Sequence, residues 1–186
     1  MIANVMSAAA VPARELSFED LVREHERMVF SIAYRYLQNA AAAEEVAQDV
    51  FLELFRSLAK LESAAHVTFW LRRVTCHRSI DYARRNKNAA AEVSWDDLDD
   101  SSRGDSHARA ESDPMLSKRL RQVIATLPEK MRMVVILRYQ EDAGLEEIAK
   151  TMRIPLNTVK STLHRSLAEL RKKLTRSLGE VRYAIF

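Results

Sequence analysis

The sequence predicts an all-α protein in which two small helical domains are joined by a flexible acidic linker. Helix-forming residues dominate the 186 positions, which include only three glycines and four prolines. No run alternates apolar and polar residues as a half-buried strand would. Apolar residues instead recur at helical spacing in two blocks, and a polar, Ser-rich stretch at 89–114 separates the blocks.

The first block predicts three helices, at 17–37, 39–58 and about 67–85, which together form a domain over 17–88. Ser17 is the expected N-cap of the first helix, with Asp20 at the capping-box position. On the second helix we expect these side chains to face inward: Val46, Val50, Phe51, Leu54, Phe55 and Leu58.

The second block predicts helices at 115–127, 129–139, 145–152 and 157–174, which form a domain over 115–178. Residues 1–16 are expected to be a disordered tail, and 179–186 an apolar C-terminal extension. The tail lacks the basic start and apolar core of a signal peptide.

Charge is distributed unevenly along the chain. Residues 1–88 carry 12 basic and 11 acidic side chains, residues 89–114 carry 2 and 8, and residues 115–186 carry 15 and 7. A net −6 linker therefore precedes a net +8 domain. This asymmetry indicates either a nucleic-acid surface on the second domain or basic side chains that only solvate helix faces.

The last two helices of the second block have the layout of a helix-turn-helix. Pro155 cannot continue the preceding helix, and Asn157 is the expected N-cap of the next. Leucines and Val159 recur along one face of that helix and fix it to the domain. In a helix-turn-helix the second helix lies in the major groove of DNA. The donors on its opposite face are the predicted duplex-reading set: Asn157, Thr158, Lys160, Ser161, His164 and Arg165.

Enzyme chemistry and bound cofactors are not expected. Cys76 and His77 are neighbours in sequence, which does not make a catalytic dyad, and the five histidines show no metal-ligand spacing. No Gly-rich phosphate loop exists. A single cysteine excludes an internal disulfide, and no apolar run approaches the ~20 residues of a membrane span. We therefore expect a cytoplasmic protein without membrane insertion.

Two sets of motifs resemble the extracytoplasmic-function (ECF) group of the bacterial sigma-70 family. Region 4 of that family is similar to "LEEIAKTMRIPLNTVKSTLHRSLAELRKKL". The family's entry into this motif is similar to the segment just upstream, "LPEKMRMVVILRYQED". Region 2.2 is similar to "AEEVAQDVFLELFRSL", and regions 2.3 to 2.4 to "FWLRRVTCHRSIDYARR". The resemblance covers about 17–88 and 115–176. Arg153 departs from it, since the family often has Gly there, and so does His77, where many members carry Asn.

The resemblance implies a sigma factor that binds core RNA polymerase, through its β′ clamp and β flap, and directs it to promoters. Region 4 would read the −35 element, region 2 would read and melt the −10 element, and an anti-sigma factor is a possible partner. The implied polymerase-binding face comprises Glu44, Glu45, Gln48, Asp49, Phe51, Leu52 and Glu53. The resemblance also implies that a loop at 63–67 forms a pocket for an extruded base. The implied −10 contacts are Ser63, His66, Phe69, Trp70, Arg72, Arg73, His77, Arg78, Arg84 and Arg85.

Several alternatives stay open at this point. A stand-alone helix-turn-helix regulator would share the DNA-reading helix but would bind promoter duplex without polymerase. Acids on the second helix are commonly only solvated. Phe69 and Trp70 are also expected at core positions, and for Trp70 packing is the favoured interpretation.

Overall fold

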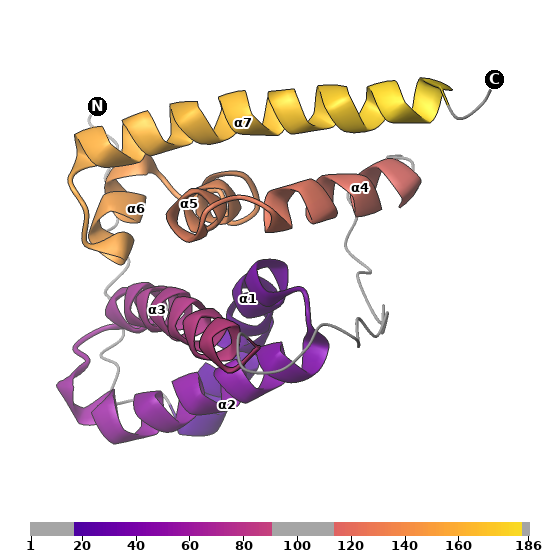
Figure 1. Ribbon diagram of the computed structural model, residues 1–186. Helices are drawn as coiled ribbons and strands as arrows, with labels where there is room; N and C mark the ends of the chain where they lie inside the picture. The colour runs from indigo at the N-terminus through magenta and orange to yellow at the C-terminus, as the bar shows by residue number, and fades with distance from the viewer. Residues whose placement is uncertain (1–16, 91–113, 184–186) are drawn as a thin grey trace, which may run out of the picture.

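The computed structural model describes residues 17–90 and 114–183, and these residues form only helices, loops and a 3-10 turn at Leu58–Lys60. The predicted all-α class is confirmed. Figure 1 shows α1–α3 as one bundle, with α4–α6 between that bundle and the long α7. The helices are α1 Phe18–Leu37, α2 Ala40–Ser57, α3 Ala64–Ala90, α4 Pro114–Ala125, α5 Glu129–Tyr139, α6 Leu145–Met152 and α7 Leu156–Tyr183.

Short polar side chains begin the first three helices. Ser17 Oγ accepts a hydrogen bond from Asp20 N, as expected of an N-cap, and the Ser17 hydroxyl also donates to the Asp20 carboxylate. Asn39 accepts from Ala42 N at 2.9 Å. Ser63 Oγ accepts from His66 N at 3.2 Å, so α3 begins at Ala64. The expectation of a loop over 63–67 is therefore wrong, because Ser63 caps a helix that already includes 64–67.

The start of α7 also differs from the expectation. The N–H groups of Thr158 and Val159 donate to the carbonyl of Pro155, at 2.9 and 3.1 Å. The helix therefore begins at Leu156, and Asn157 lies in its first turn instead of capping it. At the other end α7 continues to Tyr183, so 179–183 are helical. The predicted tail at 1–16, the linker residues 91–113 and residues 184–186 lie outside the described residues.

A first core lies within α1–α3. It buries Leu21, Val29, Ala33, Ala43, Val46, Val50, Leu54, Leu61, Val67, Leu71 and Val74. Phe55 was expected inside, yet its side chain is 65% exposed and its ring only meets Phe18 edge-on, with centroids 5.3 Å apart. Leu54 occupies the buried position of that turn, and Phe55, about 100° further round the helix, points away from the core.

A second core joins the two helical blocks. Ile32 and Tyr36 of α1 and Cys76 and Ile80 of α3 pack in one cluster with side chains of the second block: Met133, Val134, Ile136, Leu137, Ala143, Ile148 and Val159. Burial in this cluster raises the pKa of the Cys76 thiol to about 12. The two predicted domains are thus packed against each other, a contact that the helical periodicity did not reveal.

His25 makes the stability of the first bundle sensitive to acid. Its side chain is buried, and burial lowers its pKa below 6.5 despite the opposing charge of Glu24. Below pH 6.5 the unfolded chain takes up the proton more readily, so the stability that neutral His25 contributes is lost as the pH falls through its folded-state pKa.

We predict that His25→Leu reduces the fall in unfolding free energy between pH 7 and pH 5, measured by urea denaturation at each pH. The exposed His66 provides the matched control, because His66→Leu removes a histidine without removing a buried one. An equal fall in the wild type and in His25→Leu would contradict this origin of the acid sensitivity.

Two kinds of feature are absent from residues 17–90 and 114–183. No helix there is long and apolar enough to cross a membrane. No group of three or more His, Cys, Asp or Glu side chains there is arranged to hold a metal ion.

Candidate nucleic-acid interface

The first half of α7 separates a buried face from an exposed polar face. Val159, Thr162, Ser166 and Leu170 are buried, and Leu163 is half-buried. Ser166 Oγ satisfies its donor within the helix, on Thr162 O at 2.7 Å. Sequence reasoning missed these two small polar positions because it counted only apolar side chains. The six predicted duplex-reading residues are all exposed: Asn157, Thr158, Lys160, Ser161, His164 and Arg165.

Arg165 lies along this exposed face. Its Nε donates to Ser161 O at 3.2 Å, and the Ser161 hydroxyl donates to Thr158 O at 3.1 Å. Both are contacts within one helix, so the guanidinium keeps donors available to an approaching ligand. Its planar fork suits guanine edges or phosphates.

The turn between α6 and α7 is closed by a residue in the left-handed region. Arg153 has φ 53° and ψ 46°, and Ile154 N donates to Ala149 O at 3.0 Å, which ends α6. Glycine is the usual residue at such a position because it lacks a Cβ. The turn therefore keeps the glycine-type geometry although an arginine occupies it.

We predict that Arg153→Gly raises the free energy of unfolding by about 1 kcal/mol, because a non-glycine residue held at positive φ costs about 1–3 kcal/mol. Chemical denaturation measures this change. Arg153→Ala is the matched control, since it removes the same charge but keeps a Cβ in the strained region. Equal stability of the two variants would show that charge, not backbone strain, matters at this turn.

The basic side chains of α3 differ in their availability. Arg85 and His66 are exposed, whereas Arg73 and His77 are half-buried. Burial lowers the pKa of His77, and the nearby charges of Arg153 and Arg73 lower it further, while Asp81 opposes them. The two departures from the sigma-70 pattern, His77 and Arg153, are therefore electrostatic neighbours across the two helical blocks.

Three other arginines of α3 are engaged in ion pairs. Arg78 contacts Glu53 of α2, with Nη2 2.6 Å from a carboxylate oxygen. Arg84 Nε lies 2.9 Å from Glu129 of α5, and Arg72 pairs with Glu147 of α6. Three of the α3 arginines that were predicted to contact the −10 strand are therefore already engaged by glutamates. Phe69 and Trp70 are half-buried, and Trp70 packs against the first core, as its favoured interpretation expected.

A groove of about 1210 Å³ runs between α1 and α2 on another side of the first bundle. Phe51 and Leu52 form part of its lining, and Leu52 is 55% exposed. Of the acidic and amide residues expected on this face, Glu44 and Gln48 line the groove and Glu45 and Asp49 are exposed on the same helix. Glu53 is directed to Arg78 instead. The groove is lined by apolar side chains together with charges of both signs, Glu24, Glu26 and Glu44 beside Arg23 and Arg27, which suits it to a protein partner.

Comparison with known proteins agrees with this arrangement. The family model for Sigma-70 region 2 matches residues 21–89, and that for Sigma-70 region 4 matches residues 117–170. The chain is 31% identical to the ECF RNA polymerase sigma factor SigE of Mycolicibacterium smegmatis, over 95% of this chain and 68% of that protein. It is 30% identical to RNA polymerase sigma factor YlaC of Bacillus subtilis, over 89% of this chain and 96% of that protein.

Solved structures show the same fold. The sigma factor RpoE from Bartonella quintana, in complex with the anti-sigma factor NepR, has a TM-score of 0.69 at 16% identity, and the match covers 85% of this chain and 96% of that one. CnrH, in complex with the cytosolic domain of CnrY, has a TM-score of 0.64 at 18% identity, covering 88% and 92%. The chain therefore belongs to the sigma-70 family, as a sigma factor of the ECF type that directs transcription from promoters.

Proposed function

We propose that residues 17–88 work as region 2 and residues 115–178 as region 4, and that the two DNA elements of a promoter are divided between them. The observation that carries this assignment is the exposed six-residue face at the start of α7, on a helix whose other side is buried. A face of donors on the second helix of a helix-turn-helix is suited to the major groove of duplex DNA.

Region 4 would read the −35 element as duplex. Arg165 and Lys160 are the side chains suited to guanine edges, Asn157 to adenine, and Thr158 and Ser161 to phosphates. The free N–H groups at the start of α7 also attract phosphate, since a helix N-terminus carries partial positive charge. The exposed basic residues Arg171 and Lys172 further along would add attraction that does not depend on sequence.

Region 2 would hold the melted −10 strand along α3. Unstacking a base costs a few kcal/mol, which stacking on aromatic side chains and contacts to phosphates offset. Arg85 and His66 are already exposed for this role, while the other basic positions of α3 and its half-buried aromatic residues would join once the strand is in place. Because 64–67 are helical, any base pocket there would be formed by the helix start and not by a loop.

The groove between α1 and α2 is the proposed site for the polymerase β′ clamp, and region 4 would meet the β flap. An anti-sigma factor that covered the groove would compete with polymerase. Acting on promoter DNA through polymerase, the protein would work in the cytoplasm. No catalytic step is assigned to its own side chains.

A DNA-binding experiment separates this function from that of a stand-alone regulator. Fluorescence anisotropy of a labelled promoter duplex would be measured with the chain alone, with core polymerase alone and with both. We expect tight, sequence-specific binding only with both. Tight specific binding by the chain alone would favour the regulator.

A further inference from the structure

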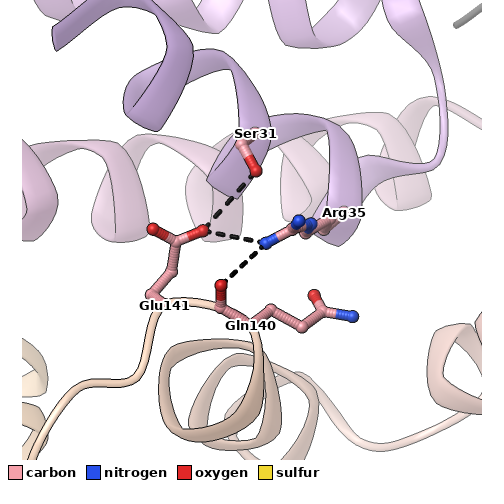
Figure 2. Close-up of polar contacts among 4 residues, drawn as sticks. All are labelled: Ser31, Arg35, Gln140 and Glu141. Carbon is pink, nitrogen blue, oxygen red and sulfur yellow. Dashed lines mark hydrogen bonds and ion pairs between the residues drawn. The ribbon is translucent and has the colours of Figure 1, made fainter. Parts of the chain in front are cut away.

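Several arginines that lie where the two helical blocks meet are paired with acids. Figure 2 shows Arg35 of α1, whose Nη1 lies 3.0 Å from both the Glu141 carboxylate and the Gln140 carbonyl. Arg72 and Arg84 of α3 pair with glutamates of the second block. In each pair a carboxylate offsets part of the cost of removing the guanidinium charge from water.

Arg132 of α5 has no such partner. Its side chain is half-buried, and its guanidinium donates to backbone carbonyls, to that of Tyr36 at 3.0 Å and to that of Ala125 at the end of α4. It forms no ion pair with a described residue, and Glu129, whose charge acts on it, is engaged by Arg84. Arg132 Nε is buried without a hydrogen-bond partner in residues 17–90 and 114–183. Burial lowers the pKa of Arg132, as expected of a cation that lacks both water and a full counter-charge.

A cavity of about 200 Å³ lies beside Arg132, where the end of α1 and the start of α2 meet the C-terminal half of α3. Its lining includes Tyr36, Asn39 and Asn86, and the exposed positions of the two asparagines connect it to solvent. A single water molecule needs only about 15 Å³, so the cavity admits a ligand of several non-hydrogen atoms. No acidic side chain is among the described residues that line it.

The Tyr36 hydroxyl is a second unsatisfied donor on a residue that lines this cavity. Tyr36 is fully buried, and its Oη has no hydrogen-bond partner among the described residues. The Arg132 guanidinium lies 5.1 Å from the centre of its ring, so the two donors belong to neighbouring side chains. Burial raises the pKa of Tyr36 to about 12, so the hydroxyl stays protonated and can donate at neutral pH. A buried donor without a partner costs free energy, which a bound acceptor would recover.

The start of α2 adds positive potential at the same place. Asn39 caps the helix by accepting from Ala42 N at 2.9 Å, and the first turn carries no acidic side chain. The free N–H groups at a helix N-terminus carry partial positive charge and attract anions. The side-chain amides of Asn39 and Asn86 supply further N–H donors.

We propose that this cavity is a binding site for a small oxyanion of the phosphate type, held by the Arg132 guanidinium, the Tyr36 hydroxyl and the start of α2. A phosphate group brings the negative charge that Arg132 lacks and several acceptor oxygens for the neighbouring donors. Water would satisfy the donors but would leave the guanidinium without a counter-charge. The ligand is either free phosphate or the phosphate group of a small metabolite.

The site is separate from the surfaces that were assigned to promoter and polymerase. Its lining residues include none of the α7 reading face, none of the predicted −10 residues and none of the α1–α2 groove. The inference therefore goes beyond the proposed function, and a result on one does not decide the other.

A titration of the full chain, followed by ¹H–¹⁵N NMR at constant ionic strength, tests the proposal. One series uses inorganic phosphate and a second uses adenosine monophosphate. We expect the side-chain N–H signals of Arg132 and Asn86 to shift and to saturate with a dissociation constant of about 1 mM or tighter. A constant at least tenfold lower for adenosine monophosphate would identify a phosphorylated metabolite as the source, and similar constants would identify free phosphate.

Two outcomes of the titration would overturn the proposal. One is the lack of saturation with either probe at about 20 mM, well above the expected dissociation constant. The other is a set of shifts confined to α7, because its exposed basic side chains attract phosphate without a pocket.

A single hydroxyl gives the first matched pair of variants. Tyr36→Phe removes a donor that has no protein partner, so we expect the dissociation constant for phosphate to rise roughly tenfold, as for loss of a hydrogen bond to a charged group. Tyr34→Phe makes the same change on the same helix, at a ring that stacks on Phe30 and does not line the cavity. Its dissociation constant should equal that of the wild type.

A single charge gives the second pair. Asn39→Asp keeps an acceptor for the N-cap of α2 but places a carboxylate at the cavity, so it should weaken phosphate binding roughly tenfold. Gln122→Glu adds the same charge at an exposed position of α4 outside the cavity lining and should leave binding unchanged. Circular dichroism checks that all four variants keep their helical content. Wild-type affinity in both Tyr36→Phe and Asn39→Asp would place the bound anion elsewhere and overturn the proposal.

Discussion

Replacing Lys160 and Arg165 by alanine is expected to weaken binding of the holoenzyme to the −35 element by roughly 100-fold, because a base-contacting arginine alone contributes about 1–3 kcal/mol. Both side chains are exposed on the first half of α7, where neither supports the core. The free energy of unfolding and the affinity for core polymerase should stay unchanged. Anisotropy with a −35 duplex and with a scrambled duplex measures the effect.

The matched control uses Arg171→Ala with Lys172→Ala, two exposed basic residues further along the same helix. This variant loses the same charge, so it should weaken binding to the −35 and scrambled duplexes alike and reduce the salt dependence. The Lys160 and Arg165 variant should lose the preference for the −35 duplex as well. If both variants kept that preference, the proposed reading face of α7 would be wrong.

Reversing the charges of Glu45 and Asp49 is expected to weaken binding of the chain to core polymerase by roughly 100-fold, because like charges brought together across an interface cost several kcal/mol. Both acids are exposed on α2, but neither lines the groove: Tyr82 of α3 donates to Glu45 at 3.2 Å, and the charge of Asp49 acts on Arg78 of α3. Biolayer interferometry with immobilised core polymerase measures the dissociation constant of Glu45→Lys with Asp49→Lys.

The control for this variant is Glu19→Lys with Glu62→Lys, which makes the same change in net charge at exposed positions of the same region. It should bind polymerase almost as the wild type does. Equal losses for the two variants would indicate a long-range effect of charge and would reject α2 as the docking face.

Features set by local sequence were predicted well. The order of the helices follows from apolar spacing, and Ser17 caps α1 because its hydroxyl reaches the N–H group three residues on. The exposed face of α7 follows from the same argument, since residues three and four apart share a helix face. The assignment to the sigma-70 family rested on motifs in both blocks, and the family models match both.

Features set by tertiary contacts were not predictable from periodicity. An apolar stripe shows that one side of a helix is buried but does not identify its partner, so the packing of Cys76 and Ile80 against the second block was missed. The same limit applies to charge. The ion pairs of Arg72 and Arg84 were not foreseen because their partners, Glu147 and Glu129, are distant in sequence. Phe55 was misplaced because a wide apolar stripe does not distinguish its centre from its edge.

The most direct test of the account is transcription in vitro. Core RNA polymerase freed of its own sigma factor would be mixed with the purified chain and genomic DNA, and the start sites of the RNA would be mapped. We expect transcripts that begin at discrete sites. Each site should be preceded by the same two sequence elements, a −35 element that is read as duplex and a −10 element that is melted. Polymerase that produced no specific transcript after addition of the chain, on any template, would contradict the account.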